Sequence, residues 1–217
     1  MQEPDVSSVV PIEELTFEAG RLCLNFTNTA EWHASDQPTE HLHSYGDLVR
    51  WAQQAEILTG DRAEYLVEES NRRSEEATQV LDQAIILRES IYRIFSAVAA
   101  DRSPKPDDLD SLNIALSESL RWLQVSQTTE GFTWTWGGDA AALDQMLWPV
   151  ARSAARLLTS EELDRVRECT DDRGCGYLFM DTSRNRSRKW CDMRGCGNRA
   201  KARRHYRRVQ ADNNSNS

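Results

Sequence analysis

The sequence predicts an α+β protein: a mostly helical N-terminal domain with a few β-strands, followed by a small cysteine-rich unit. Apolar residues recur every three to four positions through most of residues 44–158, which is the period of an amphipathic helix. They alternate instead over residues 15–30 and 121–136, as they do on a half-buried strand. Four of the five cysteines lie between residues 169 and 196.

The first element is expected to be a strand within residues 15–30. Phe17, Leu22, Leu24 and Phe26 share one side of such a strand. Residues 1–14 predict a short flexible leader. The polar residues 31–43, which include Pro38, predict a loop.

Helical periodicity begins after this loop. The predicted helices cover about residues 44–60, 73–100, 107–120 and 139–158. Ser44 is a suitable N-cap and Gly60 a suitable end for the first helix, and Pro149 should kink or split the last one. Between the last two helices, the alternating apolar residues and the Thr-Thr-Glu-Gly turn predict a β-hairpin over residues 121–136.

The charge is divided unevenly along the chain. All 217 residues together carry a net charge of −9, but residues 184–208 hold eleven Arg or Lys and one acid. That segment therefore carries +10 and the remainder −19. A cationic segment on an acidic body predicts a polyanion as the partner of that segment.

Several classes of protein are disfavoured by composition. The N-terminus lacks the apolar core of a signal peptide, and no run approaches the ~18 apolar residues of a membrane span. No serine–histidine–aspartate arrangement, phosphate loop or nucleophile elbow is present. We therefore expect a non-enzymatic protein of the reducing cytoplasm, with no membrane partner.

The clustered cysteines predict a metal site. Cys169 and Cys175 flank one glycine-containing turn, and Cys191 and Cys196 flank another. Four thiolates complete a tetrahedral Zn²⁺ site and leave no open position for catalysis, so one structural zinc is expected. The competing interpretations are four free or core cysteines and a redox switch, although no Cys-x-x-Cys is present.

The segment around these cysteines predicts the shape of the unit. Residues 177–190 are expected to form a strand, a turn and a second strand, and the residues after Cys196 a helix. A knuckle, hairpin and helix in this order describe a treble-clef-like finger. Cys196 would then lie at a helix N-terminus, which favours a thiolate.

The basic residues of the finger are the candidate nucleic-acid contacts. Like charges four residues apart destabilise a helix unless anions neutralise them, so duplex DNA is the favoured partner. Self-docking on the acidic body, another protein, or RNA remain alternatives. The candidates are Arg184, Arg186, Arg188, Lys189, Arg194, Asn198, Arg199, Lys201, Arg203, Arg204, Arg207 and Arg208.

The N-terminal body offers weaker signals. Asn25, Asn28, Thr29, Trp32 and His33 are candidates to line a small-molecule pocket. Capping by Asn28 and Thr29, with packing of Trp32 on a helix, is the favoured interpretation of the same residues.

The run from Cys175 to Lys201 resembles the CGNR zinc finger, whose name is spelled here by Cys196-Gly197-Asn198-Arg199. Residues 147–160 and 24–29 resemble the ABATE domain, which precedes this finger in bacterial proteins. The resemblance implies a stress-linked bacterial transcription regulator and maps the four zinc ligands onto Cys169, Cys175, Cys191 and Cys196. The domains expected are a leader (1–14), an ABATE-like domain (15–160), the finger (161–209) and a disordered tail (210–217).

Together these observations predict a DNA-binding transcription regulator, with the body as the natural dimerisation unit. The alternative is a body that binds a small molecule or is an enzyme, with the finger serving RNA or protein contacts.

Overall fold

The computed structural model describes residues 15–138, 141–204 and 206. It confirms an α+β protein in which helices dominate and the strands form three small antiparallel pairs. The predicted leader and tail, Arg207 and Arg208 lie outside the described residues. Among those residues, no helix is long and apolar enough to cross a membrane.

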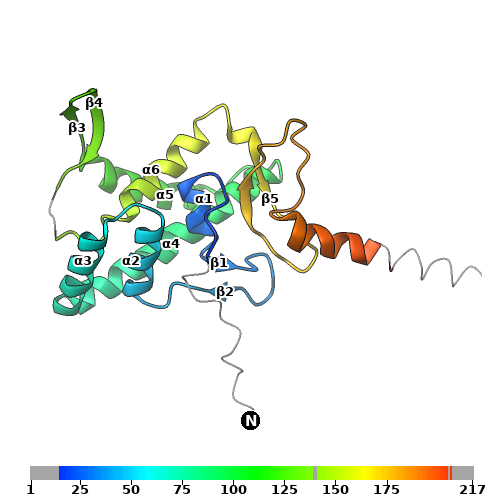
Figure 1. Ribbon diagram of the computed structural model, residues 1–217, viewed down its shortest axis with the longest axis horizontal. Helices are drawn as coiled ribbons and strands as arrows, with labels where there is room; N and C mark the ends of the chain where they lie inside the picture. The colour runs from blue at the N-terminus through cyan, green and yellow to red at the C-terminus, as the bar shows by residue number, and fades with distance from the viewer. Residues whose placement is uncertain (1–14, 139–140, 205, 207–217) are drawn as a thin grey trace, which may run out of the picture.

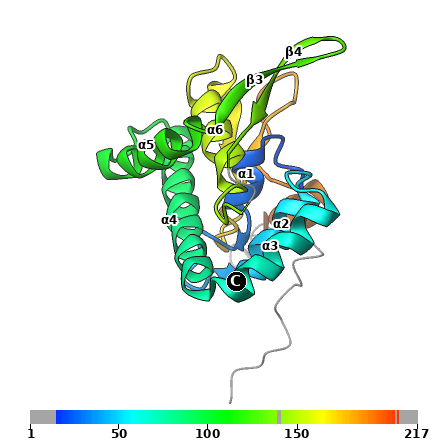
Figure 2. The same ribbon diagram turned by 90° about the vertical axis from the view of Figure 1, so that its left-hand side faces the viewer.

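The body is a bundle built around one long helix. Its helices are α1 (Leu22–Thr27), α2 (Tyr45–Gln54), α3 (Gly60–Arg72), α4 (Ser74–Ala99), α5 (Pro106–Leu120) and α6 (Leu147–Leu158). Figure 1 shows α4 passing behind α1 and α2, and Figure 2 shows α5 crossing its far end. Helices α1 and α5 both pack against α4 and α6, so α1 becomes an internal element.

Helical periodicity explains the core. One face of α4 is buried along its length, through Val80, Ala84, Leu87, Ile91 and Phe95. From the other side, Trp51 of α2 packs on Phe26 of α1 with ring centroids 4.8 Å apart. Full burial of each such large apolar side chain stabilises the fold by about 1.5–3 kcal/mol.

The strand expected within residues 15–30 is wrong, because residues 22–27 form α1. Cys23, Leu24, Phe26 and Thr27 are all buried, so the segment has no solvent face to distinguish a period of 2 from one of 3.6. The Thr27 hydroxyl also donates a hydrogen bond to the Leu24 carbonyl 2.8 Å away. Only β1 (Ala30–Glu31) and β2 (Thr39–Glu40) form a strand pair nearby.

The other predicted helices are present with altered ends. Ser44 caps α2 as expected, accepting a hydrogen bond from the Asp47 N–H. Gly60 begins α3 rather than ending α2. Helix α3 was not predicted, and only Ala63 and Leu66 of it are buried, so its apolar pattern is weak. Pro149 is the third residue of α6, where its missing N–H needs no partner, so α6 itself is not kinked. The helix predicted from residue 139 begins only at Leu147, and residues 141–146 are not helical.

The predicted hairpin of residues 121–136 is confirmed as β3 (Leu123–Thr128) paired with β4 (Gly131–Trp136). It projects from the bundle in both views (Figures 1 and 2). Phe132 and Trp134 are 77% and 58% exposed.

The hairpin predicted within residues 177–190 is wrong. The strand β6 (Leu178–Met180) pairs with β5 (Val166–Glu168), which lies before the cysteine cluster. Residues 184–189 are mostly exposed and charged and form no strand. Val166, Leu178 and Met180 belong to the core of the body, which makes β5 the better partner for β6. The π-helical turn Met193–Gly197 follows, and residues 198–204 are helical.

Candidate metal centre and its basic surface

The sulfur atoms of Cys169, Cys175, Cys191 and Cys196 all lie within 4.8 Å of one another. The Cys175–Cys191 and Cys191–Cys196 sulfur distances are 3.7 Å and 3.6 Å, too long for a disulfide. Four sulfurs at about 2.3 Å from Zn²⁺ lie about 3.8 Å apart in a tetrahedron. The donor set and its spacing therefore fit one structural zinc ion, which closes the site against catalysis.

The first two cysteines are positioned by β5 and by a tight turn. The Cys169 N–H donates to the Tyr177 carbonyl at 2.9 Å, which extends the β5–β6 pairing toward the site. Gly174 and Gly176 have φ of +83° and +65°, which other residues rarely adopt. A Cβ on either would lie 2.6 Å from backbone atoms of Ser35 or Ala34, so this turn packs directly on the body.

The last two cysteines are positioned by Asp192. Its carboxylate accepts hydrogen bonds from the Arg194 and Gly195 N–H groups, so it caps the turn that carries Cys196. These bonds keep the pKa of Asp192 below its usual value. Gly197 is buried, and a Cβ there would meet the sulfur of Met193 at 3.0 Å.

Arg199 of the Cys-Gly-Asn-Arg run points at the cysteine cluster. Its Nη2 lies 2.8 Å from the Cys196 sulfur, and its Nε donates to Asp171 at 2.9 Å. Arg203, one turn later, donates to the other oxygen of Asp171 at 3.0 Å. Arg203 also forms an ion pair with Asp172, so two carboxylates of the first knuckle hold the helix after Cys196.

Asp171 is a functional residue that sequence reasoning missed. Its side chain is 0% exposed. Burial by itself would raise the pKa of this carboxyl, but hydrogen bonds from Arg203, the Arg173 N–H and Arg199 outweigh burial and lower the pKa. Its place inside the first Cys-x₅-Cys turn was the only signal in the sequence.

Trp32 connects the body to the same cluster. The guanidinium carbons of Arg173 and Arg199 lie 4.8 Å and 5.5 Å from its ring centroid. Trp32 has a φ of +55°, which is uncommon for a bulky residue. The body therefore holds both arginines in cation–π contacts at the metal centre.

The basic candidates fall into two groups. Arg186 pairs with Asp164, and Arg188 donates to the Trp190 carbonyl at 2.9 Å. Together with Arg199 and Arg203 they hold the finger together. The other described candidates are exposed, and the cations among them have no side-chain partner within the described part of the chain: Arg184, Lys189, Arg194, Asn198, Lys201 and Arg204.

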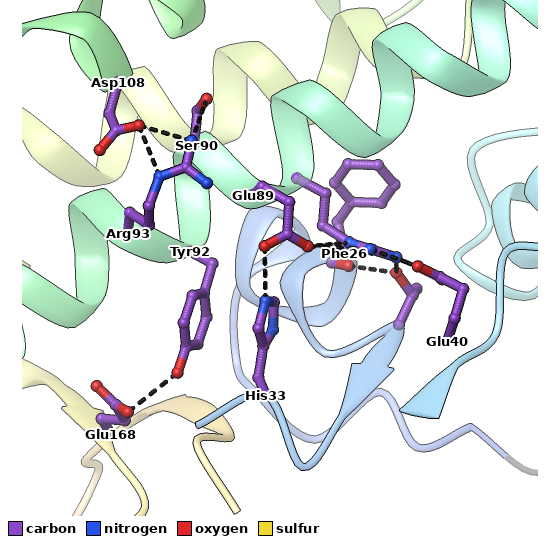
Figure 3. A network of polar contacts seen from close by, with 11 residues as sticks. Phe26, His33, Glu40, Glu89, Ser90, Tyr92, Arg93, Asp108 and Glu168 are labelled. Carbon is purple, nitrogen blue, oxygen red and sulfur yellow. Dashed lines mark hydrogen bonds and ion pairs between the residues drawn. The ribbon is translucent and has the colours of Figure 1, made fainter. Parts of the chain in front are cut away.

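The pocket candidates of the body make structural contacts. Asn28 donates to the Leu178 carbonyl at 2.9 Å and accepts from the Leu178 N–H at 3.0 Å. Asn25 accepts from the Ala19 N–H at 3.0 Å, and the Thr29 hydroxyl donates to the Phe26 carbonyl. His33 bonds Glu89 at 2.9 Å and stacks on Tyr92, as Figure 3 shows.

Comparison with known proteins gives two matches. The sequence model of ABATE, described as a "putative stress-induced transcription regulator", matches residues 20–161. The model described as "CGNR zinc finger" matches residues 165–209, which include all four clustered cysteines. No curated protein matches the chain.

Proposed function

This chain belongs to the ABATE family and carries a CGNR zinc finger, and we propose that it is a DNA-binding transcription regulator. The observation that carries the proposal is a group of exposed cations on the finger that have no side-chain partner in the described part of the chain: Arg184, Lys189, Arg194, Lys201 and Arg204. We call them the free cations.

The free cations suit the phosphate backbone of a duplex. Four other arginines of residues 184–208 already make contacts within the finger. The net charge of this segment therefore overstates the number of cations that a partner can contact. Contacts with phosphates set affinity without selecting a sequence. The exposed Asn198 is the candidate for a base edge, since asparagine pairs well with adenine.

The zinc site supports a regulator rather than an enzyme. Cys169, Cys175, Cys191 and Cys196 use all four positions of the metal, so zinc orders the finger and supplies no catalytic site. Free thiols need a reducing compartment, so the cytoplasm is part of the proposal. The proposal also includes a division into a body (15–160) and a finger (161–209). It further includes a homodimer formed through the body, because one finger reads few base pairs.

The test is a titration of the zinc-loaded protein with duplex DNA over a series of salt concentrations. Neutralisation of about five phosphates predicts a slope of log affinity against log salt of about −4 to −5. A flat response, or no binding at low salt, would contradict the proposal. Single-stranded RNA is titrated for comparison. Tyr206, on the helix that follows Cys196, is 66% exposed, and bases of a single strand can stack on such a ring.

Matched variants assign the surface. Lys201→Gln/Arg204→Gln removes two free cations and should lower the magnitude of the slope by about 2. The control, Arg102→Gln/Lys105→Gln, removes two exposed cations from the body and leaves the slope unchanged. Equal effects of both pairs would show that overall charge, and not the finger, governs binding.

A further inference from the structure

A cavity of about 420 Å³ lies in the body, away from the metal centre. It is formed where α1, the end of β4, helix α6 and the segment after α6 meet. Its walls include Arg21, Trp136, Pro149, Arg152, Arg156 and Leu157. This volume falls in the range of pockets that hold small organic molecules.

Two arginines of the cavity have no carboxylate partner among the described residues. Arg152 and Arg156 are one turn apart on α6, where like charges destabilise a helix. Five other arginines of the acidic body pair with carboxylates: Arg50, Arg72, Arg73, Arg88 and Arg93. Arg62, Arg102 and Arg121 form no ion pair among the described residues, but none of these three has a second arginine one turn away. An unneutralised pair of arginines in this setting is what a bound anion would stabilise.

The third arginine is already paired. Arg21 forms an ion pair with Glu162, which also lines the cavity. Arg21 also donates to the Gly20 carbonyl at 2.7 Å. Because Arg21 is neutralised by Glu162, Arg152 and Arg156 are the lining cations available to a ligand.

Aromatic rings orient Arg152. Its guanidinium carbon lies 5.5 Å from the ring centroid of Trp134 and 5.9 Å from that of Trp136. Trp136 in turn packs on Trp148 with centroids 6.0 Å apart, which ties this wall to α6. Guanidinium groups held in this way bind carboxylate and phosphate oxygens with a defined geometry.

We propose that this cavity binds a small organic anion. Arg152 and Arg156 hold its carboxylate or phosphate group, and Trp136, Pro149 and Leu157 cover its flat or apolar part. The proposal is independent of DNA binding, since none of the free cations lines the cavity.

The experiment is calorimetric titration of the full-length, zinc-loaded protein with phenyl phosphate, benzoate and inorganic phosphate at constant ionic strength. Phenyl phosphate and benzoate show whether the cavity prefers a phosphate or a carboxylate group. Inorganic phosphate lacks the ring and shows what the ring contributes to binding. We expect phenyl phosphate or benzoate to bind more tightly than inorganic phosphate. Arg152→Gln/Arg156→Gln should weaken this binding about tenfold or more.

Arg102→Gln/Arg121→Gln is the control of equal charge, because both residues are exposed on other parts of the body. Unchanged binding in the Arg152→Gln/Arg156→Gln variant, or equal weakening in the control, would overturn the proposal. Thermal unfolding of both variants must show a folded body for the comparison to hold. Arg152→Lys/Arg156→Lys, which keeps the charge, supplies the second measurement and should lose less affinity than the glutamine pair.

A DNA titration of the same variants separates the two functions. Arg152→Gln/Arg156→Gln should bind duplex DNA as tightly as the control. A DNA affinity that falls in that variant alone would make the cavity part of a nucleic-acid surface and overturn the small-anion proposal. Conversely, the variant Lys201→Gln/Arg204→Gln should bind DNA more weakly and should bind the small anion as tightly as the parent protein.

Discussion

Arg199 shows how one residue of a short motif can serve the metal centre. Four thiolates around Zn²⁺ leave two negative charges, and the guanidinium at 2.8 Å from Cys196 offsets part of them. Asp171 and Trp32 hold that guanidinium from two sides. Arg199 is therefore a positioning residue of the zinc site, even though it also belongs to the basic segment.

Arg199→Gln should weaken zinc retention. Partners of metal ligands typically change metal affinity by about 10–100-fold when they are replaced. We expect zinc to pass to a chromogenic chelator at correspondingly lower chelator concentration. Arg194→Gln, a charge-matched change at an exposed residue whose side chain has no partner among the described residues, should retain zinc like the parent protein. Identical retention in both variants would remove Arg199 from the zinc site.

The five cysteines should react in two classes. Burial raises the pKa of the Cys23 thiol to about 11, so it stays protonated and unreactive at neutral pH. A thiol reagent should count four reactive cysteines after chelation of zinc and a fifth only after denaturation. The Cys23→Ala variant should still show four reactive thiols after chelation, and should show no fifth thiol after denaturation. Release of all five by chelation alone would mean that the body opens together with the metal site.

At the scale of elements, the finger is joined to the body through β6. Asn28, directly after α1, exchanges two hydrogen bonds with the backbone of Leu178, and the Met180 N–H donates to the Ala19 carbonyl at 2.9 Å. Leu178 and Met180 are buried in the body's core. The zinc site therefore lies directly beside the β5–β6 strand pair, which is held in place by the body.

Asn28→Ala should destabilise the whole chain. It leaves the buried N–H and carbonyl of Leu178 without partners, at about 1–3 kcal/mol each, so we expect a loss of about 2–6 kcal/mol. Urea unfolding followed by circular dichroism measures this loss. Asn113→Ala, at an exposed position of α5, should change the unfolding free energy by less than about 0.5 kcal/mol. If Asn28→Ala lowers the unfolding free energy no more than Asn113→Ala does, then Asn28 does not anchor β6 to the body.

The same elements show what the sequence can predict. Helix α4 follows from its pattern because one face is buried over 26 residues. Both β5 and β6 are only three residues long, and their pairing across the first knuckle depends on the body's core, which no local pattern records. Likewise the four zinc ligands follow from residue type and spacing, whereas Asp171 acts through arginines 28 and 32 residues away.

At the scale of the whole molecule, a chain of polar contacts runs from β2 through α4 to the strand that precedes Cys169 (Figure 3). Arg88 of α4 is buried between Glu40 and Glu89, and Glu89 also bonds His33. His33 stacks on Tyr92, whose hydroxyl donates to Glu168 of β5 at 3.1 Å. The charged network of the body thus ends in a hydrogen bond to the finger, which adds to the apolar packing between them.

This network predicts how stability depends on pH. Burial alone would raise the pKa of Glu89, but the bonds from His33 and Arg88 outweigh burial and lower the pKa to about 2, from 4.5. A carboxylate with a lowered pKa in the folded state stabilises the protein above pH 4.5. That contribution is lost as pH falls from about 5 toward 2, because the unfolded chain takes up the proton first.

Glu89→Gln tests that dependence directly. The variant should be less stable than the parent at pH 7, and the difference between the two should shrink steadily between pH 5 and pH 2. Urea unfolding at a series of pH values measures it, with Glu64→Gln, at an exposed position of α3, as the control. Acid also releases zinc from the thiolates, but this affects all three proteins alike and cancels in the differences. A difference between parent and Glu89→Gln that stays constant from pH 7 to pH 2 would show that Glu89 does not keep its charge through these contacts.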